Sequence, residues 1–109
     1  IETDLGKAWK SLTSLPFVFA VWAAPRDLDG APELAARLAA ARDAGVRSAE
    51  MIAADFGPGM GWPVTLAKRY LTTRLKFTMG PRYRLGIQKF FELAGRHGIV
   101  SEPQPLVFA

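Results

Sequence analysis

Residues that could carry out catalysis are few and scattered in this sequence. His97 is the only histidine of the 109 residues and cysteine is absent, so no cluster has the spacing of a metal site. A helix is expected to end near His97, where its partial negative charge favours the cationic imidazole, so we interpret this residue as a cap. Asp27 and Asp29 fall in a predicted turn, in which local hydrogen bonding explains both. These residues indicate a scaffold with part of a pocket wall, and no catalytic set.

Basic residues are concentrated in one stretch of the chain. Residues 68–96 carry eight basic side chains against Glu92 alone, whereas the whole chain has a net charge of +4. Such a stretch could bind nucleic acid, an anionic metabolite or another part of the protein, although a solvated surface is the simpler interpretation. We predict no nucleic-acid partner.

The sequence gives no sign of a membrane anchor. Its longest apolar run, residues 15–24, is about half as long as a membrane-spanning helix requires, which is about 20 residues. No secretory signal is visible, and the absence of cysteine suits a reducing compartment. We therefore predict a cytoplasmic protein with no membrane partner.

The run Leu15–Ala24 is predicted to be a central β-strand. Its aromatic and β-branched residues are continuous rather than alternating, which is typical of a strand that is covered on both faces. A second, short extended segment is predicted at about 75–79, where apolar and polar residues alternate. A strand that is buried on both faces needs hydrogen-bonding neighbours. Because this sequence supplies almost none, we expect a partner region outside it.

The rest of the chain is predicted to be helical. Asp4 is a suitable N-cap for a first helix, which the sequence around Pro16 ends. One apolar stripe predicts a single long helix from about 31 to 55, and a break at Gly45 is the alternative. Two further helices are predicted, one from Pro63 to about Thr73 and one that opens at Gly80-Pro81 and closes before Gly98.

A family resemblance adds to this description. The run from Asp4 to Trp22, DLGKAWKSLTSLPFVFAVW, resembles a signature of chorismate dehydratase, the first enzyme of the futalosine route to menaquinone. The resemblance covers roughly residues 4–100, and its weaker downstream matches are Ala41–Gly45, Tyr70–Thr72, Leu75–Phe77, Leu85–Ile87 and Phe90-Phe91.

The resemblance implies an α/β fold with two lobes, like that of type II periplasmic binding proteins, in which the ligand binds between the lobes. Residues 1–14 would end the second lobe and approach the hinge, and residues 15–24 would be the crossing strand. Residues 25–109 would form the C-terminal helical part of the first lobe. The chain is thus expected to be the mostly helical C-terminal portion of a protein that an N-terminal part completes.

The resemblance also implies a reaction. It predicts a lyase that dehydrates chorismate to 3-[(1-carboxyvinyl)oxy]benzoate without a metal or an organic cofactor. The alternative, which the lack of a visible catalytic set motivates, is a non-catalytic solute-binding protein for a small anionic ligand. The expected partners are the anionic substrate chorismate and the N-terminal part of the same protein.

Only part of the binding site can be placed in this sequence. The family's known substrate contacts lie mainly in the N-terminal part, so the catalytic residues are expected there and stay unknown. The hinge supplies the substrate-cleft candidates Thr13, Leu15, Pro16 and Phe17, whose hydroxyl and backbone groups could meet a carboxylate. The alternative is that these residues only set the path of the strand that crosses between the lobes. Ser14 replaces the glycine that is usual in the family, so the turn before Pro16 is expected to differ slightly.

Overall fold

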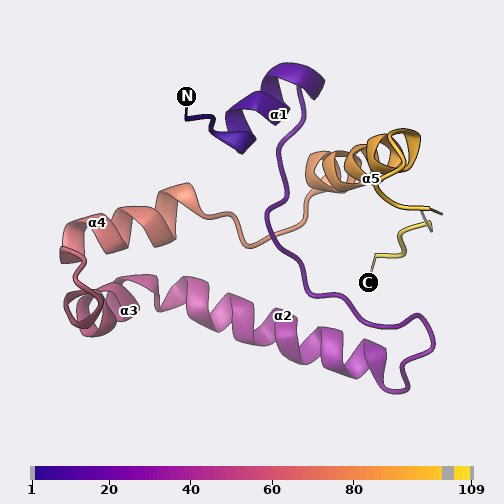
Figure 1. The fold of residues 1–109 in the computed structure, drawn as a ribbon. Coiled ribbons are helices and arrows are strands. Elements are labelled where there is room, and N and C mark those ends of the chain that lie inside the picture. Colours follow the sequence, from indigo (N-terminus) through magenta and orange to yellow (C-terminus); the bar gives the residue numbers. More distant parts are fainter. Residues whose placement is uncertain (1, 102–104, 109) are drawn as a thin grey trace. The chain divides into compact units, whose positions relative to one another are not determined.

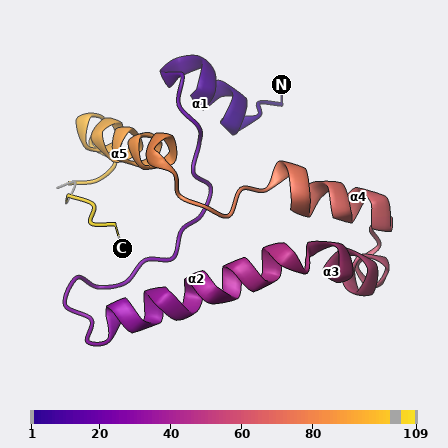
Figure 2. The ribbon, with the colours of Figure 1, turned by 180° about the vertical axis from the view of Figure 1, so that it is seen from behind.

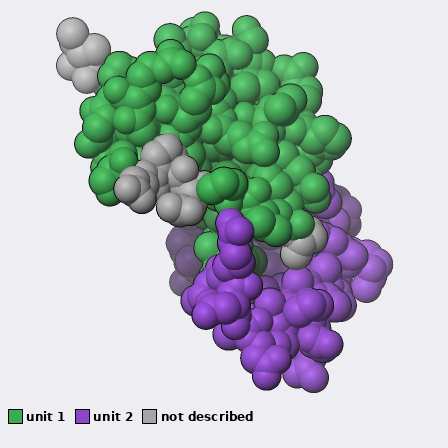
Figure 3. Space-filling model, turned by 90° about the vertical axis from the view of Figure 1, so that its right-hand side faces the viewer, with its two compact units in different colours: residues 1–23, 79–109 green, residues 24–78 purple. Residues whose placement is uncertain are grey.

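The computed structural model describes residues 2–101 and 105–108 as helices that extended or irregular segments connect (Figure 1). The chain separates into two compact units, of which unit 1 comprises residues 1–23 and 79–109 and unit 2 comprises residues 24–78 (Figure 3). The elements in chain order are α1 (Leu5–Thr13), α2 (Ala31–Arg47), α3 (Ala49–Phe56), the 3-10 turn η1 (Pro58–Met60), α4 (Val64–Arg69), the π-helical turn η2 (Tyr70–Arg74) and α5 (Pro81–Arg96).

The predicted α/β fold with a central strand is wrong. Over residues 2–101 and 105–108 no strand or sheet forms, so the two-lobed fold of the periplasmic binding proteins is not supported either. The run 15–24 is an extended segment that forms no β-ladder, and residues 75–79 likewise pair with no other strand (Figures 1 and 2). Within the described chain, the backbone amides of residues 17–24 donate no hydrogen bond. The error has a physical cause. An apolar run indicates a tendency to be buried, but a strand also needs neighbouring strands to hydrogen-bond with.

Unit 1 begins with the helix that the sequence predicts. The Oδ1 atom of Asp4 accepts a hydrogen bond from the backbone N–H of Lys7 at 2.9 Å, which caps α1. Helix α5 also follows its predicted signals, because it starts at Pro81 and Gly98 lies beyond its end at a φ of 69°.

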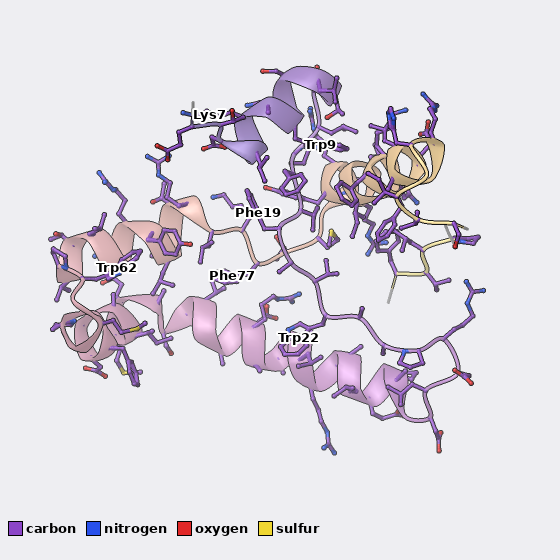
Figure 4. All side chains as sticks on the ribbon, viewed as in Figure 1. Lys7, Trp9, Phe19, Trp22, Trp62 and Phe77 are labelled. Atoms are coloured by element: carbon purple, nitrogen blue, oxygen red, sulfur yellow. The ribbon has the colours of Figure 1, made fainter. Side chains whose placement is uncertain are left out.

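Aromatic rings join α1, the extended segment and α5 within unit 1. The ring of Trp9 lies 5.8 Å from that of Phe17 and 5.9 Å from that of Phe90, and Phe17 and Phe90 are 6.0 Å apart. Phe19 extends the cluster, with its ring 4.9 Å from that of Phe17, and the residue as a whole is 78% exposed (Figure 4). Such edge-to-face arrangements are favourable beyond the area that they bury. This cluster determines the path of the chain after α1.

The predicted single helix from 31 to 55 is wrong, because Ser48 divides it into α2 and α3. Ser48 has φ and ψ of −95° and 9°, yet its N–H donates to the Ala44 carbonyl and its own carbonyl accepts from the N–H of Ile52. The helix therefore bends without losing these bonds. The bend lies three residues after Gly45, the position of the predicted alternative.

Helices α3 and α4 pack through small residues in unit 2. Ala49, Ala53 and Ala67 are buried, and a Cβ atom added at Gly57 would lie 3.2 Å from the Cβ of Ala67. Helix α4 packs against α3, and the helix then continues into the wider π-helical turn η2 (Figure 1). The helix predicted from Pro63 to about Thr73 is confirmed, although its second half is π-helical. Small residues allow this close approach, but their side chains bury little apolar area.

Candidate functional site

The hinge candidates lie in one turn of unit 1, directly after α1. The hydroxyl of Thr13 donates to the Trp9 carbonyl at 2.9 Å and accepts from the backbone N–H of Leu15 at 3.1 Å. Its hydrogen is therefore committed to the helix end, and only an acceptor position is left for a ligand. Thr13 serves first to close α1 and to begin the turn.

Ser14 forms the turn in an uncommon conformation. Its φ of 59° and ψ of 12° place it in the left-handed region that a glycine occupies without strain. Its N–H donates to the Lys10 carbonyl at 2.9 Å. The turn thus takes a conformation suited to glycine although the side chain is that of serine.

Pro16 and Phe17 are held by their surroundings. The indole Nε1 of Trp9 donates to the Pro16 carbonyl at 3.2 Å, and the ring of Phe17 contacts those of Trp9 and Phe90. Gly86 of α5 lies so close to the Pro16 carbonyl that a Cβ atom there would overlap it. Pro16 and Phe17 therefore hold the turn against α1 and α5.

Leu15 lines a shallow depression beside α5. The depression has a volume of about 280 Å³ and is also bordered by Leu85, Gln88, Lys89 and Glu92. Thr13, Leu15, Pro16 and Phe17 are thus neighbours in one turn, and their contact with a substrate stays a prediction.

Arg82 of α5 contacts this turn, although it was not among the candidate site residues. Its Nη2 atom donates to the Ser14 carbonyl at 2.7 Å, across 68 positions of the chain. The side chain is exposed, and its other N–H groups form no hydrogen bond within the described residues. A guanidinium has five donors and binds carboxylates in a fork, so Arg82 can hold the turn and still bind an anion. The signals in the sequence were its place in the first turn of the predicted helix and its membership of the basic stretch 68–96.

The predicted basic stretch is divided between the units, and many of its charges are used locally. In unit 2, Lys68 pairs with Glu50 at 2.8 Å. In unit 1, Lys89 and Arg96 both contact Glu92, at 3.0 and 2.7 Å. The hydrogen bond from Lys89 is the main cause of a lowered pKa at Glu92; desolvation opposes it, and the charges of Lys89 and Arg96 lower the pKa further. The guanidinium of Arg84 lies 5.0 Å from the ring of Phe108.

The described part of the chain holds neither a metal-binding cluster nor a membrane-spanning helix. No group of three or more His, Asp or Glu side chains gathers there in a way that could hold a metal ion. No helix among the described residues is long and apolar enough to cross a membrane. His97 occupies the C-cap position of α5, where the sequence analysis expects it.

A family model described as menaquinone biosynthesis matches residues 2–96. The match spans the hinge turn, Arg82 and most of both units. No solved structure matches the chain significantly.

Proposed function

Because the chain belongs to the menaquinone biosynthesis family, we propose that it is part of the lyase that dehydrates chorismate to 3-[(1-carboxyvinyl)oxy]benzoate. The family match over residues 2–96 is the observation that carries this proposal, together with the signature from Asp4 to Trp22. The reaction removes one water molecule and makes the ring aromatic, which favours the product. Its product carries two carboxylates, so the site needs cationic groups and hydrogen-bond donors.

Arg82 is the residue that we propose for binding one of these carboxylates. It is exposed, it is fixed at the hinge turn by the Ser14 carbonyl, and it keeps donors for a ligand. The turn residues Thr13, Leu15, Pro16 and Phe17 would then form the adjoining wall. No residue from Thr13 to Phe17 carries a titratable side chain, so the proposed role of this turn is binding rather than proton transfer.

Turnover by the full-length gene product tests both the reaction and the role of Arg82. We expect loss of chorismate and a rise in benzoate-type absorbance. Arg82→Gln is expected to raise KM about tenfold or more, since a hydrogen bond to a charged group contributes about 1.5–3 kcal/mol, and to change kcat less. Arg84→Gln, which removes the same charge two residues along α5, is expected to change KM less than about twofold.

The two parts of the proposal fail in different ways. Equal KM changes in the Arg82 and Arg84 variants would remove Arg82 from the binding site but leave the reaction in place. No turnover in the unaltered gene product would contradict the reaction itself.

The second candidate function is a non-catalytic binding protein for a small anion. The lack of titratable groups in the hinge turn favours it. Calorimetry with chorismate separates the two functions, because a binding protein would retain the ligand unchanged and a lyase would release a new product.

We also propose that the N-terminal part implied by the resemblance covers exposed apolar side chains of unit 1. Phe19 and Trp22 are 78% and 85% exposed, and burial of such side chains typically contributes about 1.5–3 kcal/mol each. Acrylamide quenching of Trp22, with Trp9 and Trp62 replaced by Phe, should be strong in the 109-residue chain and weaker in the full gene product. Equal quenching would contradict this covering.

A further inference from the structure

A second cavity lies wholly within unit 2, in residues to which neither the resemblance nor the family match assigns a role. Its volume is about 260 Å³, and it forms where the end of α2 and the start of α3 face the turn η2 and the segment that follows. The apolar part of its lining consists of Val46, Ala49, Leu71, Leu75 and Phe77, the last of which is labelled in Figure 4.

The π-helical turn η2 shapes this cavity. The N–H of Leu75 donates to the carbonyl of Tyr70, five residues earlier, at 3.0 Å. This wider turn carries Leu71 and Thr72 into the lining and directs Leu75 and the next residues along the opening. π-Helical turns are rare, and they occur frequently at functional sites.

The polar groups of the cavity favour an anion. Lys76, Thr78 and Thr72 line it together with the apolar residues, and no lining residue is acidic. Lys76 makes no ion pair with any residue that the structure describes. The hydroxyl of Thr72 already donates to the Lys68 carbonyl at 2.8 Å, which leaves Lys76 and Thr78 as the side-chain donors.

The backbone of the lining segment has further donors that are not used within the described residues. The N–H groups of Lys76, Phe77 and Thr78 donate to no carbonyl within the described residues. A carboxylate accepts several hydrogen bonds at once, whereas a neutral apolar molecule would leave these donors to water. The charge of Lys76 and the available hydrogen-bond donors therefore both favour an anionic ligand in this cavity.

We propose that this cavity binds a small aromatic monocarboxylate of the size of benzoate. Its carboxylate would meet Lys76, Thr78 and the adjoining backbone amides, and its ring would pack on Leu71, Leu75 and Phe77. The proposal does not depend on the dehydration reaction, because the cavity and the hinge turn belong to different units.

Titration of the full-length gene product with benzoate, followed by ¹⁵N NMR of the amides of residues 71–78, tests the proposal. We expect saturable shifts at the amides of residues 71–78, and binding of uncharged benzamide that is at least about fivefold weaker. Lys76→Gln should weaken benzoate binding about tenfold, as expected for loss of a hydrogen bond to a charged group. Lys68→Gln is the matched control, because Lys68 lies outside the lining and pairs with Glu50, and its effect should stay below twofold.

A pocket-filling variant gives an independent test. Val46 is 49% exposed, so Val46→Phe should fill the cavity without disturbing the core and should abolish the shifts. Equal binding of benzoate and benzamide, or equal weakening by the two lysine variants, would overturn the proposal. Shifts that stay absent from residues 71–78 would overturn it as well.

Discussion

Ser14 shows how one residue fixes the hinge turn against its own conformational preference. A side chain in the left-handed region costs roughly 1 kcal/mol relative to glycine. The cost is offset by the hydrogen bond from the Ser14 N–H to Lys10 and by the bond from Arg82 to the Ser14 carbonyl. Both bonds use backbone atoms of Ser14, so any residue other than proline can keep them at this position.

Ser14→Gly is therefore expected to raise the free energy of unfolding by up to about 1 kcal/mol. Urea denaturation measures the change. Ser11→Gly is the control, because Ser11 lies inside α1, where glycine should instead lower stability by about 0.5 kcal/mol. Equal losses in both variants would contradict the argument from backbone conformation.

Glu92 gives the chain a pH dependence that can be measured at a single residue. Its pKa is lowered in the folded state, mainly by the hydrogen bond from Lys89. A carboxyl group with a lowered folded pKa contributes stability above its unfolded pKa and loses it as pH falls through the folded pKa. Glu92→Gln should therefore flatten the fall in Tm from about pH 5 downward at low salt. Parallel Tm profiles for the two proteins would show that these ion pairs contribute nothing.

At the scale of elements, the approach of α5 to the extended segment depends on Gly86. This glycine is buried, and its missing side chain makes room for the Pro16 carbonyl. Helix propensity and packing make opposite predictions here, because alanine favours a helix but has no space at this position.

Gly86→Ala is expected to lower the free energy of unfolding by about 1–3 kcal/mol, since packing outweighs propensity. Gly45→Ala is the matched control in α2, where no described atom beyond the neighbouring residues and the helix's own nearby backbone lies within 4 Å of an added Cβ atom, and it should stabilise the chain by about 0.5–1 kcal/mol. Thermal denaturation of both variants tests this. A stabilising Gly86→Ala would contradict the close contact.

The elements also show what sequence patterns can and cannot predict. Helix ends were predictable, because Asp4, Pro81 and Gly98 act through local backbone chemistry. The bend at Ser48 was not, because an apolar stripe keeps its spacing across a bend that preserves hydrogen bonds. The prediction of a strand at 15–24 was wrong, because the pairing of a β-strand depends on residues elsewhere in the protein. Arg82 was missed for a related reason, because its partner Ser14 is distant in sequence.

At the scale of the whole molecule, the family match spans both units, whereas the proposed sites belong to one unit each. The hinge turn with Arg82 lies in unit 1, and the cavity with Lys76 lies in unit 2. The basic stretch that looked continuous in sequence is divided in the same way. Its charges pair with Glu50 in one unit and with Glu92 in the other. In each unit, part of the basic stretch therefore has an acidic partner of its own.

The most direct test of the proposed function is to identify what the full-length gene product makes from chorismate. Mass spectrometry and ¹H NMR of the reaction mixture should show a product that has lost one water molecule and has aromatic ring protons. The substrate should be consumed in proportion. Chorismate that is recovered unchanged, whether or not it binds, would contradict the proposed dehydration.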